Sequence, residues 1–193
     1  SVGKSSIRRM RSIDSRAIKD THESGTTAIN ATLGYVAGAG EPYEYTINDI
    51  AEWNSIILQY PNDFLKIWKA EDIHRAKREN KIGIIFGFQN ATSVGDKIER
   101  ISTFANLGVR IIQLTYNDAN QIGHGSGVPE NQGLSSFGHE VIEALNENKV
   151  LIDLSHSGEN TCLDAIKASK VAITISHTGC RALNNIPRNK TDE

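Results

Sequence analysis

The chain has 193 residues, of which 38% are hydrophobic and 23% charged, and its formal net charge at pH 7 is −2. These values are ordinary for a globular protein, and a chain of this size buries roughly 70% of its unfolded surface on folding. The charge is far from the concentrated positive potential that nucleic-acid binding requires. We therefore expect no nucleic-acid partner.

Cysteine content and hydropathy bear on the compartment. Cys162 and Cys180 are the two cysteines of the chain, and they form no Cys-x-x-Cys pair. Two cysteines are too few for a disulfide framework. The apolar runs, such as residues 82–88, are much shorter than the roughly 20 residues that cross a bilayer. With no signal peptide in view, we expect a cytoplasmic protein and no membrane segment.

Five short apolar runs predict the strands of a parallel sheet. They are rich in β-branched residues and nearly continuous in hydrophobicity, as expected for strands buried on both faces, although the first run is weaker. The runs are residues 26–33, 82–88, 109–115, 150–155 and 171–176. A further short extended piece is expected at residues 64–68.

Helical patterns separate these runs, because apolar side chains recur three and four positions apart. The predicted helices are residues 47–59, 71–80, 96–107, 136–148 and 160–169. Gly108 follows one of them, at the place where a helix end favours a residue with positive φ. Alternation of strands and helices with short connections predicts right-handed crossovers and a parallel sheet.

The chain shows no linker rich in Pro, Gly or Ser and no repeat, so we expect a single domain over residues 1–193. A closed eight-stranded barrel typically needs about 250 residues, so the order of elements fits a partial barrel and an open doubly wound sheet equally well. The chain begins with Ser1 rather than Met and ends on Thr191-Asp192-Glu193, which is typical of a helix start. We expect it to be an internal piece of a longer protein.

Two of the predicted strands are followed directly by a histidine. These residues are His156 and His177, and each comes after a serine. In α/β folds the working residues gather at the carboxyl ends of the strands. A single histidine at a strand end would be read as a structural residue. Because imidazole is the commonest metal ligand, the matched pair instead predicts a metal site.

Two histidines do not complete a zinc site, which needs three protein ligands and an open position. Gln89 and Asp118 follow two other strands and are candidates to contribute oxygen. Asp153 lies three positions before His156, so its side chain is expected to face the other way. The Gly-rich loop 123–127 is expected to be a flexible connector beside the pocket. No Gly-x-Ser-x-Gly motif supports serine catalysis.

Four segments, in this order and spacing, resemble the membrane (renal) dipeptidase family of zinc metallopeptidases. They are GLSSFGHEVIEALN (133–146), VLIDLSHS (150–157), AITISHT (172–178) and IPRNKTDE (186–193). The resemblance is clearest from Lys81 to Glu193 and weaker back to about Arg8. It implies an α/β fold in which the five runs are about the second to sixth strands of a TIM-type (β/α)8 barrel, with the rest of the barrel missing.

The resemblance also implies roles for individual residues. His156 and His177 match the two histidine ligands of the metal centre. Arg188 matches an arginine that binds the carboxylate of the substrate, a role suited to its bidentate fork, whereas the alternative is a salt bridge on the rim. Tyr116 stands where the typical dipeptidase has a histidine that touches the substrate. Gln89 stands where it has the glutamate that bridges two zinc ions.

The glutamine is the main departure from the family. A bridging carboxylate supplies negative charge and one oxygen to each metal, whereas a glutamine supplies one neutral oxygen, so we expect one or two zinc ions with a weakened second site. The run Gly87-Phe88-Gln89-Asn90 resembles a divergent branch of the family. The family's His-x-Asp ligand pair and catalytic aspartate have no match here. We therefore assign no catalytic residue and expect this chain alone to lack dipeptidase activity.

Three functions are open at this stage. The first is a metal-dependent hydrolase that cleaves the amide bond of a dipeptide or a similar small molecule. The second is a mononuclear or altered-substrate amidohydrolase, and the third is a non-catalytic barrel that acts as a binding module. About two, one or no zinc ions per full-length chain would distinguish them. Exposed edges of an incomplete barrel would favour self-association, of which a homodimer is the simplest form.

Overall fold

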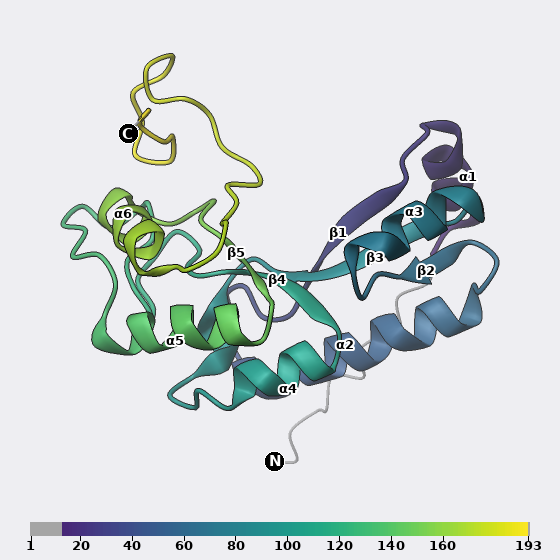
Figure 1. Ribbon diagram of the computed structural model, residues 1–193, viewed down its shortest axis with the longest axis horizontal. Helices are drawn as coiled ribbons and strands as arrows, with labels where there is room; N and C mark the ends of the chain where they lie inside the picture. Colours follow the sequence, from purple (N-terminus) through teal and green to yellow (C-terminus); the bar gives the residue numbers. More distant parts are fainter. Residues whose placement is uncertain (1–12, 193) are drawn as a thin grey trace, which may run out of the picture.

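The computed structural model describes residues 13–192, so the first twelve residues and Glu193 of the expected domain lie outside it. Helices and strands alternate along this part of the chain (Figure 1). The strands are β1 (Ala28–Leu33), β2 (Phe64–Lys66), β3 (Ile82–Phe88), β4 (Val109–Gln113) and β5 (Leu151–Asp153). The helices are α1 (Ser15–Glu23), α2 (Pro42–Gln59), α3 (Ala70–Arg78), α4 (Arg100–Asn106), α5 (Ser136–Glu147) and α6 (Glu159–Ala168), with a 3-10 turn η1 (Ala91–Val94).

All strand pairings of the sheet are parallel, in the order β1-β3-β4-β5. β1 pairs with β3 from Ala28↔Gly83 to Leu33↔Phe88. The short β2 pairs with the first residues of β3, and β4 pairs with its last residues. The predicted parallel α/β sheet is therefore confirmed. Within residues 13–192 the sheet is open, and its edge strands are β1, the short β2 and β5.

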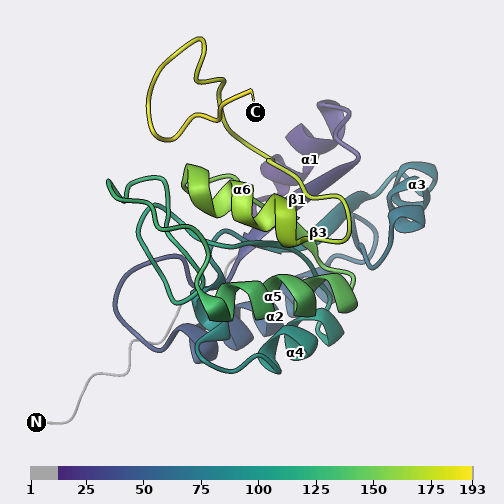
Figure 2. The same ribbon diagram turned by 60° about the vertical axis from the view of Figure 1, so that its left-hand side comes forward.

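Helices α2, α4 and α5 lie together on one side of the sheet (Figures 1 and 2). The main apolar core fills the space between them and the strands. Phe86 of β3 and Phe104 of α4 are fully buried, and the Phe104 ring stands edge-on to Phe88 with centroids 5.0 Å apart. Burial of one such side chain contributes roughly 1.5–3 kcal/mol. This packing holds the sheet in place and thereby positions the strand ends.

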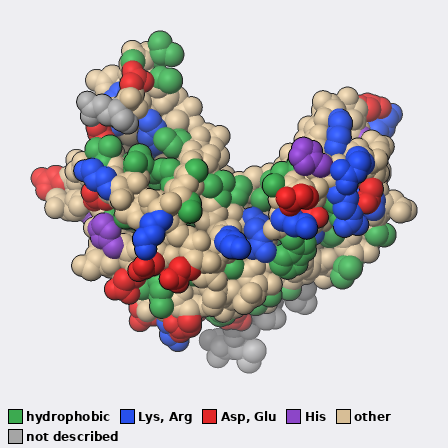
Figure 3. Space-filling model, in the orientation of Figure 1, with side chains coloured by type: hydrophobic (Ala, Val, Ile, Leu, Met, Phe, Trp, Pro, Cys, Tyr) green, Lys and Arg blue, Asp and Glu red, His purple; other side chains and the backbone are tan. Residues whose placement is uncertain are grey.

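The other face of the sheet is less covered. Ile85, Ile111 and Leu151 line a cavity of about 520 Å³ on this face, together with Trp68 and Arg110. Figure 3 shows that the molecule is hollowed between the C-terminal segment and the arm that carries α1 and α3. No helix among residues 13–192 has the length and apolar character needed to cross a membrane.

The fifth predicted strand, at residues 171–176, is wrong for the described structure. This run makes a single isolated bridge, between Asp153 and Thr174, and Val171 and Ile175 remain 55% and 40% exposed. The physical reason is that β5 offers it a partner on one side, whereas within residues 13–192 no strand lies on its other side. The two-sided burial that its hydrophobicity predicts is therefore not achieved.

The other four runs do form strands; β1 and β3 end where predicted, whereas β4 and β5 each end two residues earlier. The five predicted helices also occur, although α2 begins at Pro42 rather than at residue 47 and α4 at Arg100 rather than near residue 96. Helix α1 was not predicted. Gly108 has a φ of 97° directly after this helix, as predicted from its position. The piece expected at residues 64–68 is β2.

Candidate metal centre

His156 and His177, which follow β5 and the run at residues 171–176, meet at one edge of the sheet. β5 leads into the turn that carries His156, and the Thr174 bridge places the following His177 beside it. Their Nε2 atoms lie 3.1 Å apart, and the ring planes are inclined by 62°. Because parallel strands leave a sheet at the same edge, residues 21 positions apart in the sequence come within direct contact.

Hydrogen bonds determine which nitrogen of each ring carries a proton. Nδ1 of His156 lies 2.8 Å from Oδ1 of Asn117, an oxygen that can only accept, so this Nδ1 donates. Nδ1 of His177 lies 2.8 Å from Oγ of Ser176, whose own proton goes to Oδ2 of Asp153 at 2.5 Å. Both Nε2 atoms therefore direct lone pairs at each other. A cation between them would replace this repulsion with ligation, and a zinc ion fits such a donor pair.

The charge state of His156 suits this arrangement. Burial, followed by the nearby Arg188 and His177, lowers its pKa from 6.5 to about 4. The imidazole is therefore neutral at neutral pH, which is the form that binds metal. Tyr116 adds to the burial, because its ring stacks on the His156 ring with centroids 4.2 Å apart and 20° between the planes.

The two predicted oxygen donors, Gln89 and Asp118, form hydrogen bonds with residues other than the histidines. The amide nitrogen of Gln89 donates to Oγ1 of Thr32 at 3.1 Å, and its backbone oxygen accepts from Gln113 at 2.6 Å. Asp118 is exposed, and its backbone oxygen accepts from Gly125. Within residues 13–192 no three His, Cys, Asp or Glu side chains form a metal-binding group. None of the hydrogen bonds described for Gln89 or Asp118 reaches either histidine ring.

Asp153 is hydrogen-bonded to the residues that precede both histidines. Its side chain is 2% exposed and accepts from Ser155 and Ser176, the two serines that precede the histidines. None of the hydrogen bonds described for its carboxylate reaches an imidazole, and its bonds to the two serines were not predicted from the sequence. The signal was present in the paired Ser-His dipeptides and in the spacing of Asp153 and Ser155, which puts both on one face of the strand.

The Gly-rich loop 123–127 is bonded to the rim, contrary to the flexible connector that we expected. The amide of Ser126 donates to the His156 carbonyl at 2.8 Å, and that of Gly127 donates to the Asn117 carbonyl at 2.8 Å. A Cβ added at Gly125 would lie 2.4 Å from the Asn117 carbonyl, so only glycine fits there. The loop thus holds the backbone of Asn117 through the Gly127 amide. Asn117 follows a strand end but was not singled out from the sequence.

Arg188 lies beside the histidine pair. Its Nη2 donates to the His177 carbonyl at 2.8 Å and its Nη1 to Oγ1 of Thr178 at 3.3 Å. Among the residues that the structure describes, Arg188 forms no ion pair, so the rim salt bridge considered from the sequence is not formed there. Burial lowers the pKa of its guanidinium. Because a guanidinium remains protonated at neutral pH even so, the side chain still brings positive charge to the site.

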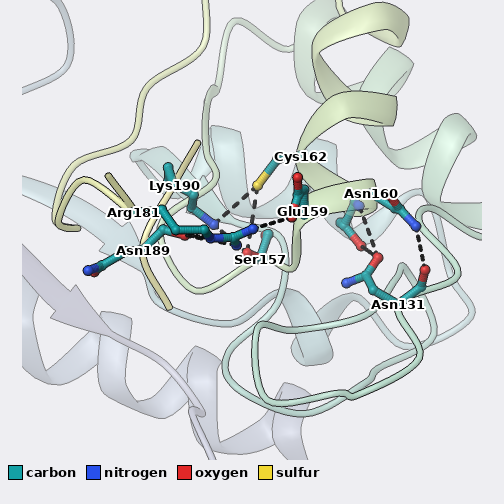
Figure 4. Close-up of polar contacts among 9 residues, drawn as sticks. Asn131, Ser157, Glu159, Asn160, Cys162, Arg181, Asn189 and Lys190 are labelled. Carbon is teal, nitrogen blue, oxygen red and sulfur yellow. Dashed lines mark hydrogen bonds and ion pairs between the residues drawn. The ribbon is translucent and has the colours of Figure 1, made fainter. Parts of the chain in front are cut away.

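The segment that carries Arg188 is fastened to the start of α6 (Figure 4). Arg181 pairs with Glu159, and Nζ of Lys190 donates to the Ser157 carbonyl and lies 3.2 Å from Sγ of Cys162. These contacts tie both ends of the 181–190 segment to the residues that follow His156. Arg188 is therefore placed by contacts remote from its own guanidinium.

A parallel α/β sheet that carries its functional residues, here two histidines, on its carboxyl rim is typical of a large class of α/β proteins. The chain belongs to one family of that class: the model described as Membrane dipeptidase (Peptidase family M19) matches residues 20–193. The resemblance noted in the sequence is thereby confirmed.

Curated relatives agree with this family. An uncharacterised dipeptidase of Schizosaccharomyces pombe is 30% identical over 154 residues, which are 77% of this chain and 37% of that protein. The dipeptidase tcpJ of Claviceps purpurea is 29% identical over 100 residues, which are 51% of this chain and 24% of that protein. The chain thus spans well under two thirds of the length of these relatives.

Solved structures show the same fold. An amidohydrolase from Pseudomonas aeruginosa superposes with a TM-score of 0.87 at 34% identity, covering 94% of this chain and 54% of that one. A metallo peptidase from Rhodobacter sphaeroides, liganded with a phosphinate mimic of the dipeptide L-Ala-D-Ala, has a TM-score of 0.75 at 19% identity, covering 95% and 55%. These likenesses support the predicted fold class.

Proposed function

We propose that the complete gene product that includes this chain is a metal-dependent hydrolase that cleaves the amide bond of dipeptides or a similar small amide. The observation that carries this proposal is the close approach of His156 and His177, whose Nε2 atoms lie 3.1 Å apart. Membership of the membrane dipeptidase family supports the choice of substrate class. Arg188 lies beside the pair, and because a guanidinium binds carboxylates well, it also favours a substrate that carries a carboxylate.

The proposed metal is zinc, held by His156 and His177 with the amide oxygen of Gln89 as a further donor. When bound, zinc polarises a carbonyl and lowers the pKa of a water ligand. Tyr116, whose ring covers a face of His156, contacts the substrate beside the metal. Arg188 orients the substrate through its carboxylate. The residue that takes the proton from water is not assigned to this chain.

A mononuclear or altered-substrate amidohydrolase is the second candidate, and Gln89 favours it. Its side chain is neutral, and Thr32 holds its amide nitrogen at 3.1 Å. A neutral donor does not offset the mutual repulsion of two zinc ions as a carboxylate does. One zinc ion per complete gene product would support this candidate, and two would support the dinuclear dipeptidase.

We further propose that residues 1–193 form one domain, because one continuous apolar cluster extends from Ala31 of β1 to Ala165 of α6. The free thiols of Cys162 and Cys180 favour the cytoplasm, where thiols stay reduced. The net charge of −2 argues against a nucleic-acid partner. A homodimer would cover the open sheet edges.

The test uses the complete gene product, reconstituted with zinc. Metal content and dipeptide hydrolysis are measured for the wild type, for His156→Ala and His177→Ala, and for His139→Ala, an exposed histidine of α5 that serves as the matched control. We expect each rim variant to lose zinc affinity by about 100-fold or more, with hydrolysis falling in parallel. Unchanged zinc binding in both rim variants would overturn the metal site. Bound zinc without hydrolysis of any dipeptide would overturn the substrate class.

A further inference from the structure

Asp153 is a buried carboxylate whose hydrogen bonds all come from two serines. Its Oδ1 accepts from the amide and hydroxyl of Ser155, at 3.0 and 2.7 Å, and from the amide of Ser176 at 3.1 Å. Its Oδ2 accepts from the Ser176 hydroxyl at 2.5 Å. Four donors satisfy a buried negative charge. The carboxylate therefore joins the ends of the two segments that carry His156 and His177.

The two serines differ in what else they contact. Ser176 Oγ lies 2.8 Å from the Nδ1 atom of His177. Ser155 Oγ accepts from the backbone amide of His177 at 2.9 Å, and none of the hydrogen bonds described for it involves a ring. A chain of hydrogen bonds thus runs from the Asp153 carboxylate through the Ser176 hydroxyl to the imidazole of His177. It does not include the imidazole of His156.

The partner of His156 is of a different kind. Its Nδ1 donates to the neutral amide oxygen of Asn117. His177 is therefore linked to a full negative charge through one hydroxyl, and His156 to a neutral dipole. A carboxylate behind a histidine fixes its tautomer and favours a cation in front of it.

We propose that Asp153 is a positioning residue that acts through Ser176, holding His177 with the proton on Nδ1 and the lone pair of Nε2 directed at the candidate metal position. The hydroxyl of Ser176 donates to Asp153 and can then only accept from His177. The tautomer follows from the hydrogen bonds alone. Its consequence for metal binding rests on the proposed function.

Two matched serine variants test this proposal. Ser176→Ala removes the link between the carboxylate and the ring, whereas Ser155→Ala removes a bond to the same carboxylate and leaves the ring contact in place. The 15N chemical shifts of the imidazoles are recorded for the metal-free protein, and Asp153→Asn is added where it folds. We expect His177 to carry its proton on Nδ1 in the wild type and in Ser155→Ala, and to lose this preference in Ser176→Ala.

If His177 keeps its Nδ1 proton in Ser176→Ala, or loses it equally in Ser155→Ala, the proposal that Asp153 acts through Ser176 is overturned. Zinc titration of the same proteins is the second readout. We expect Ser176→Ala to weaken zinc binding by about 10- to 100-fold and Ser155→Ala to weaken it much less. If the wild type binds no zinc, the proposed function fails, whereas the tautomer measurement still decides the role of Asp153.

Discussion

The phenol ring of Tyr116 lies nearly flat on the imidazole of His156, with centroids 4.2 Å apart. This contact removes one face of the imidazole from water, and burial is the largest cause of its lowered pKa, about 4. Tyr116→Ala should therefore raise the pKa of His156 from about 4 toward 6.5, because the charged form would be better hydrated. Tyr116→Phe, which keeps the ring, is the control and should leave the pKa nearly unchanged. NMR titration of the metal-free protein measures both, and an unshifted pKa in Tyr116→Ala would contradict the prediction.

Close backbone packing at Gly125 leads to a second prediction. Gly125→Ala would place a Cβ 2.4 Å from the Asn117 carbonyl, and backbone atoms cannot move aside as a flexible side chain can. We expect a loss of stability on the order of 1–3 kcal/mol and weaker zinc binding, since Asn117 holds His156. Gly123→Ala in the same loop, where the nearest atoms are 3.1 Å away, should cost less. Urea denaturation would show the difference, and equal effects of the two variants would argue against this packing.

Lys66 provides a pH-dependent prediction away from the rim. Burial, and then the charge of Arg110, lowers its pKa from 10.5 to about 8. Between about pH 8 and 10.5 the unfolded chain therefore binds more protons than the folded chain. The free energy of unfolding should rise with pH across this window relative to a Lys66→Met variant, whereas below pH 8 the difference should be constant. Denaturation curves measured on both sides of pH 8 decide the matter, and a difference that falls with rising pH would refute it.

The segment that carries Arg188 should loosen when its remote contacts are removed. Arg181 pairs with Glu159, and Lys190 bonds the Ser157 carbonyl. The double variant Arg181→Leu, Lys190→Met should increase amide exchange over residues 179–190 by about 10-fold or more, because each bond to a charged group contributes roughly 1.5–3 kcal/mol. Lys170→Met, which removes an exposed ion pair with Glu143, is the control and should have little effect. Exchange that is unchanged in the double variant would show that other contacts hold the segment.

Local patterns predicted most of the elements and the two central histidines. Hydrophobic runs and helical periodicity are properties of short segments, so β3, β4, α5 and α6 could be found without knowledge of their neighbours. The run at 171–176 shows the limit, because a strand forms only where a partner strand lies beside it. The hydrophobicity of this run is visible in the sequence, but the presence or absence of a neighbouring strand is not.

The contacts that hold His156 and His177 in place depend on the tertiary structure. The Ser-His dipeptides and the strand ends determined that His156 and His177 would lie on one rim, since parallel strands share a direction. Their 3.1 Å approach, the bonds of Asp153 to both serines and the stacking of Tyr116 join residues that are distant in the chain. Such contacts depend on sheet register and loop path, which no local pattern encodes, because they form only when separate segments pack together. The sequence by itself placed the two histidines at one edge of the sheet, and the tertiary structure determined how they are held.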